Sequence, residues 1–161
     1  MQRAGAGLAH PLALIGIAVL LLNDHVFKAT MPGVVTGKLS DFAGLLFFPL
    51  LLQSIVEWTS LSMRAWRGPS MRVLASCALA TGVCFTAIET WQPADELYRQ
   101  TWSAMQTLPR ALVAAVLDLP APRAVVVAHV MDAEDLIALP ALAAAVWAGR
   151  ARNAERAIFS A

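Results

Sequence analysis

Four apolar stretches recur along the chain, and they restrict its possible folds more than any short motif does. They cover residues 8–22, 42–56, 73–88 and 136–148, and charges or tryptophans bound each of them. With its flanks, each approaches the roughly 20 residues that a helix needs to cross a bilayer. The chain is 58% hydrophobic and only 14% charged, whereas a soluble domain is about 25% charged. The sequence therefore predicts a membrane protein.

The fold predicted from these stretches is an all-α membrane protein with four transmembrane helices. We expect one transmembrane domain over residues 1–161, with spans at about 8–27, 40–58, 72–91 and 132–149. The first stretch could instead be a secretory signal, because Arg3 precedes it, but no small-x-small cleavage site follows it. An uncleaved first helix is the better interpretation.

The distribution of charge predicts the orientation. With both termini cytoplasmic, the inner side holds seven Lys and Arg residues and two acids, and the outer side holds five Lys and Arg residues and nine acids. An excess of Lys and Arg beside cytoplasmic span ends is typical of inner-membrane proteins. Trp58, Trp66 and Trp147 then fall at the inner boundary and Trp91 at the outer one. We therefore expect a bacterial inner-membrane location with both termini in the cytoplasm.

The outer connection between the third and fourth spans is too long to be without structure. Over residues 93–120, Leu97, Trp102, Met105 and Leu108 follow a helical period among polar residues, which predicts an interfacial helix on the outer surface. Residues 124–130 are rich in valine and leave open a strand, a loop or an extension of the last helix.

Ionisable and other polar groups gather, under this topology, at the outer ends of all four spans. They are Asp24, His25 and Lys28 after the first span, Lys38 and Asp41 before the second, Glu89 and Gln92 after the third, and His129, Asp132 and Asp135 before the fourth. A bundle would bring these ends together into one acidic site.

The helix dipole separates these acids into two groups. Asp41, Asp132, Glu134 and Asp135 lie at helix N-termini, where a carboxylate is stabilised and capping suffices as a role. Asp24 and Glu89 lie at helix C-termini, where the dipole opposes them, so they need a compensating partner such as Lys28 or Lys38. Ionisable groups at membrane depth are candidates for function.

Three roles fit these residues. A carboxylate could act as general acid or base on a lipid-linked substrate, with Glu89, Asp41 and Asp24 as catalytic candidates. The candidates for substrate binding are Lys38, Lys28, His25, Gln92, Asp132 and Asp135. The carboxylates with His25 and His129 could instead bind a divalent cation, or the charges could form a structural ion-pair network. The sequence identifies no cofactor and leaves both a metal and enzymatic activity open.

Three local patterns resemble the VanZ-like family of small bacterial four-helix membrane proteins. They are residues 38–42, similar to the family's Lys-x-x-His-Phe; residues 89–92, similar to its Glu-x-x-Gln; and Asp132 with Asp135, similar to its Asp-rich entry to the last helix. Asp41 stands where the family has His, and Leu139 where it has Asn. The family is associated with glycopeptide resistance and the cell envelope, so the resemblance implies a location and a class of partner.

The leading functional hypothesis is an activity at the outer face on a lipid-linked cell-envelope substrate. The alternatives are a non-catalytic membrane binding or scaffold protein and a divalent-cation-binding membrane protein. The expected partners are the lipid bilayer and a lipid-linked envelope precursor. A net charge of +1 and the lack of a basic run argue against nucleic acid.

Overall fold

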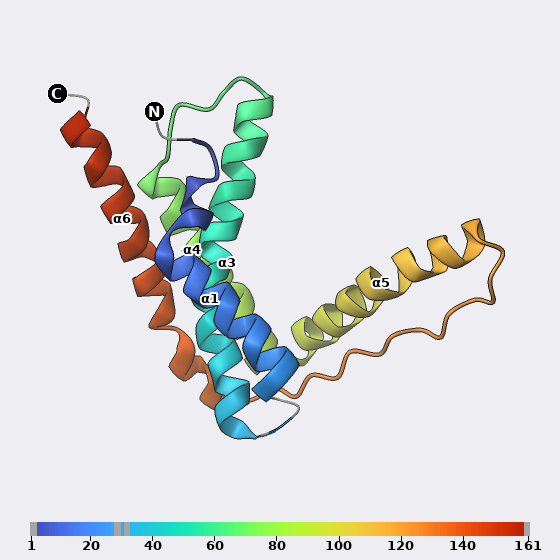
Figure 1. Cartoon of the computed structure of the whole chain (residues 1–161). Helices are drawn as coiled ribbons and strands as arrows, with labels where there is room; N and C mark the ends of the chain where they lie inside the picture. Colours follow the sequence, from blue (N-terminus) through green and yellow to red (C-terminus); the bar gives the residue numbers. More distant parts are fainter. Residues whose placement is uncertain (1–2, 28–29, 31–32, 160–161) are drawn as a thin grey trace. The chain divides into compact units, whose positions relative to one another are not determined.

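A computed structural model describes residues 3–27, 30 and 33–159, and this part of the chain is helical, with no strand (Figure 1). Its elements are η1 (Ala6–Ala9), α1 (Pro11–Leu22), η2 (Asn23–Phe27), α3 (Val34–Ser62), α4 (Met71–Thr90), α5 (Gln92–Val116), η3 (Ala133–Ala138) and α6 (Ala141–Phe159). The prediction of an all-α chain is confirmed.

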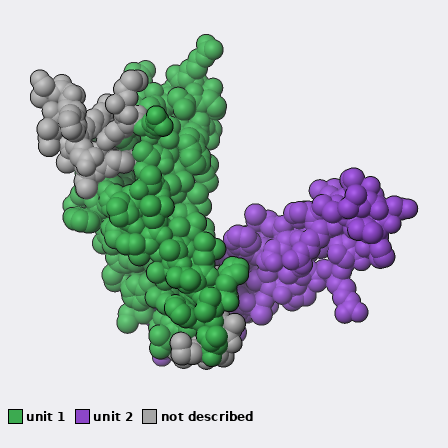
Figure 2. Space-filling model, viewed as in Figure 1, with its two compact units in different colours: residues 1–83, 137–161 green, residues 84–136 purple. Residues whose placement is uncertain are grey.

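The chain divides into two compact units, coloured in Figure 2. The first unit comprises residues 1–83 and 137–161, and the second comprises residues 84–136. Compact units are defined by packing alone, so one transmembrane domain over residues 1–161 stays a prediction.

The first unit is built around a small core to which four helices contribute. Ala13 of α1, Leu50 of α3, Leu74 of α4 and Ala145 of α6 are buried against one another. Two of these four are alanines, and small residues at helix contacts allow close approach, as they do between membrane helices. A proline in the middle of a span frees an upstream carbonyl and is therefore expected to face other helices rather than lipid, and Pro49 is indeed fully buried.

Two helices have the length and composition of membrane spans. Residues 35–62 of α3 and Met71–Thr90 of α4 are long and apolar enough to cross a bilayer. Large apolar side chains are exposed on them, including Phe48, Ile55 and Leu79. Such exposure suits a lipid solvent, and it supports a membrane location without identifying the membrane or the orientation.

The first helix begins and ends near its predicted boundaries. The Nδ1 atom of His10 accepts a hydrogen bond of 3.2 Å from the Leu12 N–H, and Pro11 occupies the first helical position. Proline suits that position because its missing N–H has no helical partner to lose. α1 ends at Leu22, and a turn of π-helix, η2, follows it.

The segment expected as the fourth span is not one continuous helix. Residues 132–149 comprise the short 3₁₀ helix η3, a break at Pro140, and the first half of α6. Proline lacks an N–H and its ring clashes with the carbonyl four residues earlier, so it ends one helix more readily than it bends it. A proline inside the predicted span would suggest a bend, and at Pro140 the structure shows an interruption instead.

The second unit contains α5 and a long extended return. α5 confirms that the segment after α4 contains a helix, and this helix is longer than the predicted period because it runs from Gln92 to Val116. Trp91, with φ −130° and ψ 110°, separates it from α4. Residues 124–130, which we call the extended segment, form neither a strand nor an extension of α6.

Candidate functional site

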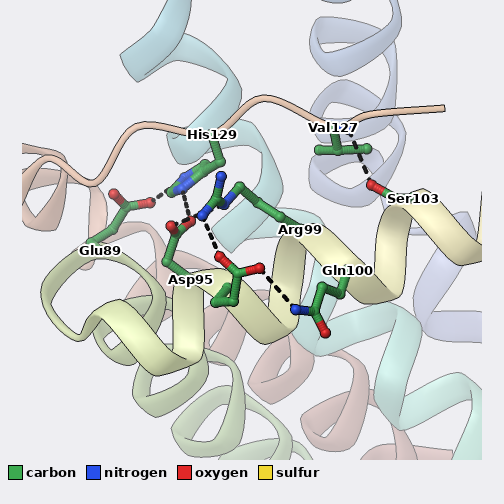
Figure 3. A network of polar contacts seen from close by, with 8 residues as sticks. Glu89, Asp95, Arg99, Gln100, Ser103, Val127 and His129 are labelled. Carbon is green, nitrogen blue, oxygen red and sulfur yellow. Dashed lines mark hydrogen bonds and ion pairs between the residues drawn. The ribbon is translucent and has the colours of Figure 1, made fainter.

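Four ionisable side chains of the second unit form a polar network in which the two carboxylates are buried (Figure 3). His129 is at its centre: its Nδ1 atom lies 2.8 Å from Asp95 Oδ1 and its Nε2 atom lies 3.2 Å from Glu89 Oε1. The Nε atom of Arg99 lies 3.1 Å from Asp95 Oδ2. Glu89 comes from the end of α4, Asp95 and Arg99 from α5, and His129 from the extended segment.

Local helix geometry positions the α5 members of the network. Asp95 lies in the first turn of α5, where the positive end of the helix dipole stabilises a carboxylate. Arg99 follows it by four residues, so the two side chains lie on one face of the helix. Arg99 Nη2 also lies 2.6 Å from Glu96 Oε2, and Gln100 Nε2 donates 2.8 Å to Glu96 Oε1.

Glu89 lies in the last turn of α4, where the dipole opposes its charge. The predicted compensation was a lysine, Lys28 or Lys38. The compensation observed comes from His129 and from the backbone N–H of Asp132, which donates 3.1 Å to Glu89 Oε2. Backbone and imidazole donors thus provide what the sequence assigned to a lysine.

Both ring nitrogens of His129 contact a carboxylate oxygen. A carboxylate only accepts hydrogen bonds, so both contacts are hydrogen bonds when both ring nitrogens carry a proton. In that imidazolium form, the charges of His129 and Arg99 balance those of Glu89 and Asp95. The edge of the Tyr98 ring packs against the imidazole, with ring centroids 5.3 Å apart.

The extended segment runs antiparallel to α5 along a column of polar side chains. The Val125 N–H donates 2.9 Å to Thr107 Oγ1, the Val127 N–H donates 3.1 Å to Ser103 Oγ, and His129 reaches Asp95. Four helical residues rise about 6.0 Å and two extended residues about 6.6 Å. Because these repeats nearly match, one strand edge can bond to successive turns of the helix.

The network is closed rather than open to a ligand. Glu89 and Asp95 are buried, and each of their four carboxylate oxygens contacts a group of this chain. Among the described residues there is no group of three or more His, Cys, Asp and Glu side chains suited to a metal ion. The geometry therefore offers the divalent-cation hypothesis no support.

Four of the residues predicted for the site lie in this second unit. Glu89 and Asp132 meet through the hydrogen bond described above. Asp132 also caps η3, because its Oδ1 atom accepts 2.8 Å from the Glu134 N–H, as its position at a helix start predicted. Gln92 is exposed at the first position of α5, and Asp135 lies in η3.

The other predicted residues lie in the first unit or outside the described part. His25 is exposed, and its Nδ1 atom lies 3.0 Å from the Leu21 carbonyl oxygen of its own helix. Lys38 and Asp41 lie near the start of α3, and each makes a polar interaction. Lys28 and the side chain of Asp24 lie outside the described residues.

The side chain of Asn23 provides a buried amide in the first unit. Asn23 is fully buried, and its Nδ2 atom donates 2.6 Å to both the Thr36 carbonyl oxygen and Ser40 Oγ. These bonds connect the end of α1 to the start of α3. Asn23 thus organises the region in which Asp24, Lys38 and Asp41 were expected to act.

Sequence reasoning did not identify the partners of His129. It placed His129 among the outer polar groups but assigned no role to Asp95 or Arg99. One signal was available, because an Asp and an Arg four residues apart on a helix form an ion pair. The contacts from His129 to Asp95 and Glu89 span 34 and 40 residues, and no local pattern reveals such pairs.

Comparisons with known proteins find no match: no protein-family model, no curated protein and no solved structure is similar to the chain. The resemblance to the VanZ-like family therefore stays a prediction.

Proposed function

We propose that this chain is a non-catalytic scaffold protein of the bacterial inner membrane, with both termini cytoplasmic and α5 bound to the outer membrane surface. α1 with η2, α3, α4 and the segment from η3 into α6 are the four passages through the bilayer. The second unit is the part presented to the periplasm.

Contacts at one end of the first unit support an even number of passages. The Gly5 N–H donates 2.8 Å to Glu57 Oε2 near the end of α3, so η1 lies beside that end (Figure 1). A Cβ atom added to Gly149 of α6 would lie 2.0 Å from Leu74 in the first turns of α4. The start of the chain, the end of α3, the start of α4 and the second half of α6 are therefore neighbours. This end carries Arg64, Arg67, Arg72 and Arg150, as expected for a cytoplasmic side.

The exposed face of α5 supports the surface position. Leu97, Met105, Leu108, Leu112 and Val116 fall within an arc of about 100°, and each is more than half exposed. The opposite face carries the polar column that the extended segment covers. A helix that covers its polar side with its own chain and exposes its apolar side fits a lipid surface, into which such helices sink about 5–10 Å.

The closed network carries the non-catalytic assignment. A general acid or base must reach a substrate, whereas Glu89 and Asp95 are buried and fully engaged by His129, Arg99 and the Asp132 N–H. The network therefore fastens the extended segment and the start of η3 to α4 and α5. Activity on a lipid-linked envelope substrate stays a prediction, and it now depends on the first-unit candidates Asp24 and Asp41.

Thiol labelling tests the surface position. In a variant with Cys77 and Cys84 replaced by alanine, single cysteines are introduced by Leu112→Cys on the apolar face and Gln106→Cys on the polar side. A membrane-impermeant maleimide is then added to intact spheroplasts. We expect Gln106→Cys to be labelled and Leu112→Cys to be protected until detergent is added. Equal labelling of both variants would show that α5 lies in water and not on the membrane. Labelling of Gln106→Cys only after lysis would show that α5 is on the cytoplasmic side, which is the opposite of the proposed orientation.

Charge neutralisation tests the structural role of the network. Glu89→Gln keeps the shape of the side chain but removes the charge that faces His129, so it should lower the melting temperature and the folded yield of the purified protein. Glu96→Gln, on the exposed part of the same ion-pair group, is the matched control and should change neither. Unchanged stability of Glu89→Gln would contradict the structural role and return Glu89 to the catalytic candidates.

A further inference from the structure

The extended segment has a free backbone edge. Only alternate N–H groups face α5, those of Val125 and Val127, because successive groups of an extended chain point to opposite sides. The N–H groups of Val126, Ala128 and Val130 bond to no other described residue. Three donors and the carbonyls beside them thus form an unpaired edge of an extended backbone.

The composition of this edge favours pairing with another extended chain. Residues 124–130 read Ala-Val-Val-Val-Ala-His-Val, without Gly, Pro, Lys, Arg or an acid. The side chains of Val126 and Val130 are 86% and 83% exposed. Proteins usually protect such an edge with a charge, a proline or a bulge, and uncharged, β-branched segments of six or seven residues are those that self-pair.

We propose that the extended segment pairs antiparallel with the same segment of a second copy of this chain. The pairing is two-fold symmetric about Ala128, so that Ala128 faces Ala128 and Val126 faces Val130. Val126, Ala128 and Val130 then occupy hydrogen-bonded positions, where each donates its N–H to the opposite chain and accepts a hydrogen bond at its carbonyl. The interface is isologous, as in most homodimers.

A second copy suits this edge better than another strand for two reasons. It offers the same unpaired donors in the same spacing, so every bond formed on one side is repeated on the other. Copies in one bilayer also share depth and orientation, and a two-fold axis along the membrane normal makes strands in the membrane plane antiparallel. This second reason rests on the proposed surface position of α5, whereas the backbone pairing itself does not.

Cysteine crosslinking in native membranes tests the register. With Cys77 and Cys84 replaced by alanine, Ala128→Cys places two thiols across the symmetry axis, where Cα atoms of a hydrogen-bonded pair lie about 5.5 Å apart, within disulfide reach. Ala124→Cys is the control, because its two copies would be about 26 Å apart along the strands. We expect a crosslinked dimer from Ala128→Cys and none from Ala124→Cys. No dimer from Ala128→Cys, or equal amounts from both, would overturn the proposal.

Proline substitution tests the free edge without disturbing α5. Ala128→Pro removes an N–H that points away from α5, and proline is tolerated at such an edge position. Light scattering of the full-length protein in detergent should show a dimer for the wild type and a monomer for Ala128→Pro. Circular dichroism should show the same helix content for both. A monomeric wild type, or a dimeric Ala128→Pro variant, would contradict the pairing, and neither result depends on whether α5 touches lipid.

Discussion

The substitution His129→Ala removes the side chain that holds the extended segment against two helices. In the wild type, the imidazole bridges Asp95 and Glu89 at 2.8 Å and 3.2 Å. Its loss leaves two buried carboxylates with one fewer partner each. The extended segment then keeps only the two backbone bonds to Ser103 and Thr107, both on α5.

The magnitude follows from the bonds lost. A hydrogen bond to a charged group contributes about 1.5–3 kcal/mol. Asp95 keeps Arg99 and Glu89 keeps the Asp132 N–H, and water can enter beside an imidazole that is already 22% exposed. We therefore expect the low end of the sum, about 3 kcal/mol, which corresponds to an increase of about a hundredfold in the open population of the segment.

Hydrogen exchange measures this opening directly. Mass spectrometry of the protein in lipid nanodiscs should show faster exchange in a peptide covering residues 121–131, at the amides of Val125 and Val127. The control is His25→Ala, because His25 is exposed and contacts only a carbonyl of its own helix. An acceleration below about threefold, or less than about 0.7 kcal/mol, would refute the idea that His129 clamps the segment.

Two further predictions concern the first unit. Gly149→Ala should destabilise the protein by about 1–3 kcal/mol through overpacking, because the new Cβ would lie 2.0 Å from a side-chain carbon of buried Leu74. A thermal melt should show this loss of stability. The control Gly44→Ala should melt like the wild type, because the nearest atom to its new Cβ would be 3.7 Å away. Asn23→Ala should cost about 2 kcal/mol, because it removes two hydrogen bonds that a buried side chain donates to α3. Ser62→Ala, which loses an exposed bond within one helix, should be near neutral in the same melt, and equal effects of the two would contradict the assigned role of Asn23.

Much of the helical framework was predictable because its causes are local. The apolar stretches predicted α1, α3 and α4, and Pro11 suits the first position of a helix. The periodic residues from Leu97 to Leu108 indicated α5. Pro140 was recognised as a perturbation, yet whether a proline bends or ends a helix depends on whether neighbours satisfy the freed backbone groups. The fourth span was therefore predicted as one helix and observed as two elements.

The candidate site was only partly predictable. The sequence identified Glu89 as an acid that needs compensation, because its position at a helix end opposes the dipole, and it identified Asp132 as a cap. It assigned the compensation to lysines. The partner of Glu89 is His129, in residues 124–130. The composition of this segment suits a strand, a loop or a helix equally, so its path along α5 could not be predicted from the sequence.

The sequence by itself determined most of the helices, and it predicted a membrane environment, because apolar length and charge distribution act residue by residue and can be evaluated before the packing is known. What only the tertiary structure decided is which charges meet. Residues 40 apart came together at His129 because α4, α5 and the extended segment fold back on one another. A hydrogen bond depends on distances of a few tenths of an ångström, which the order of residues along the chain does not contain.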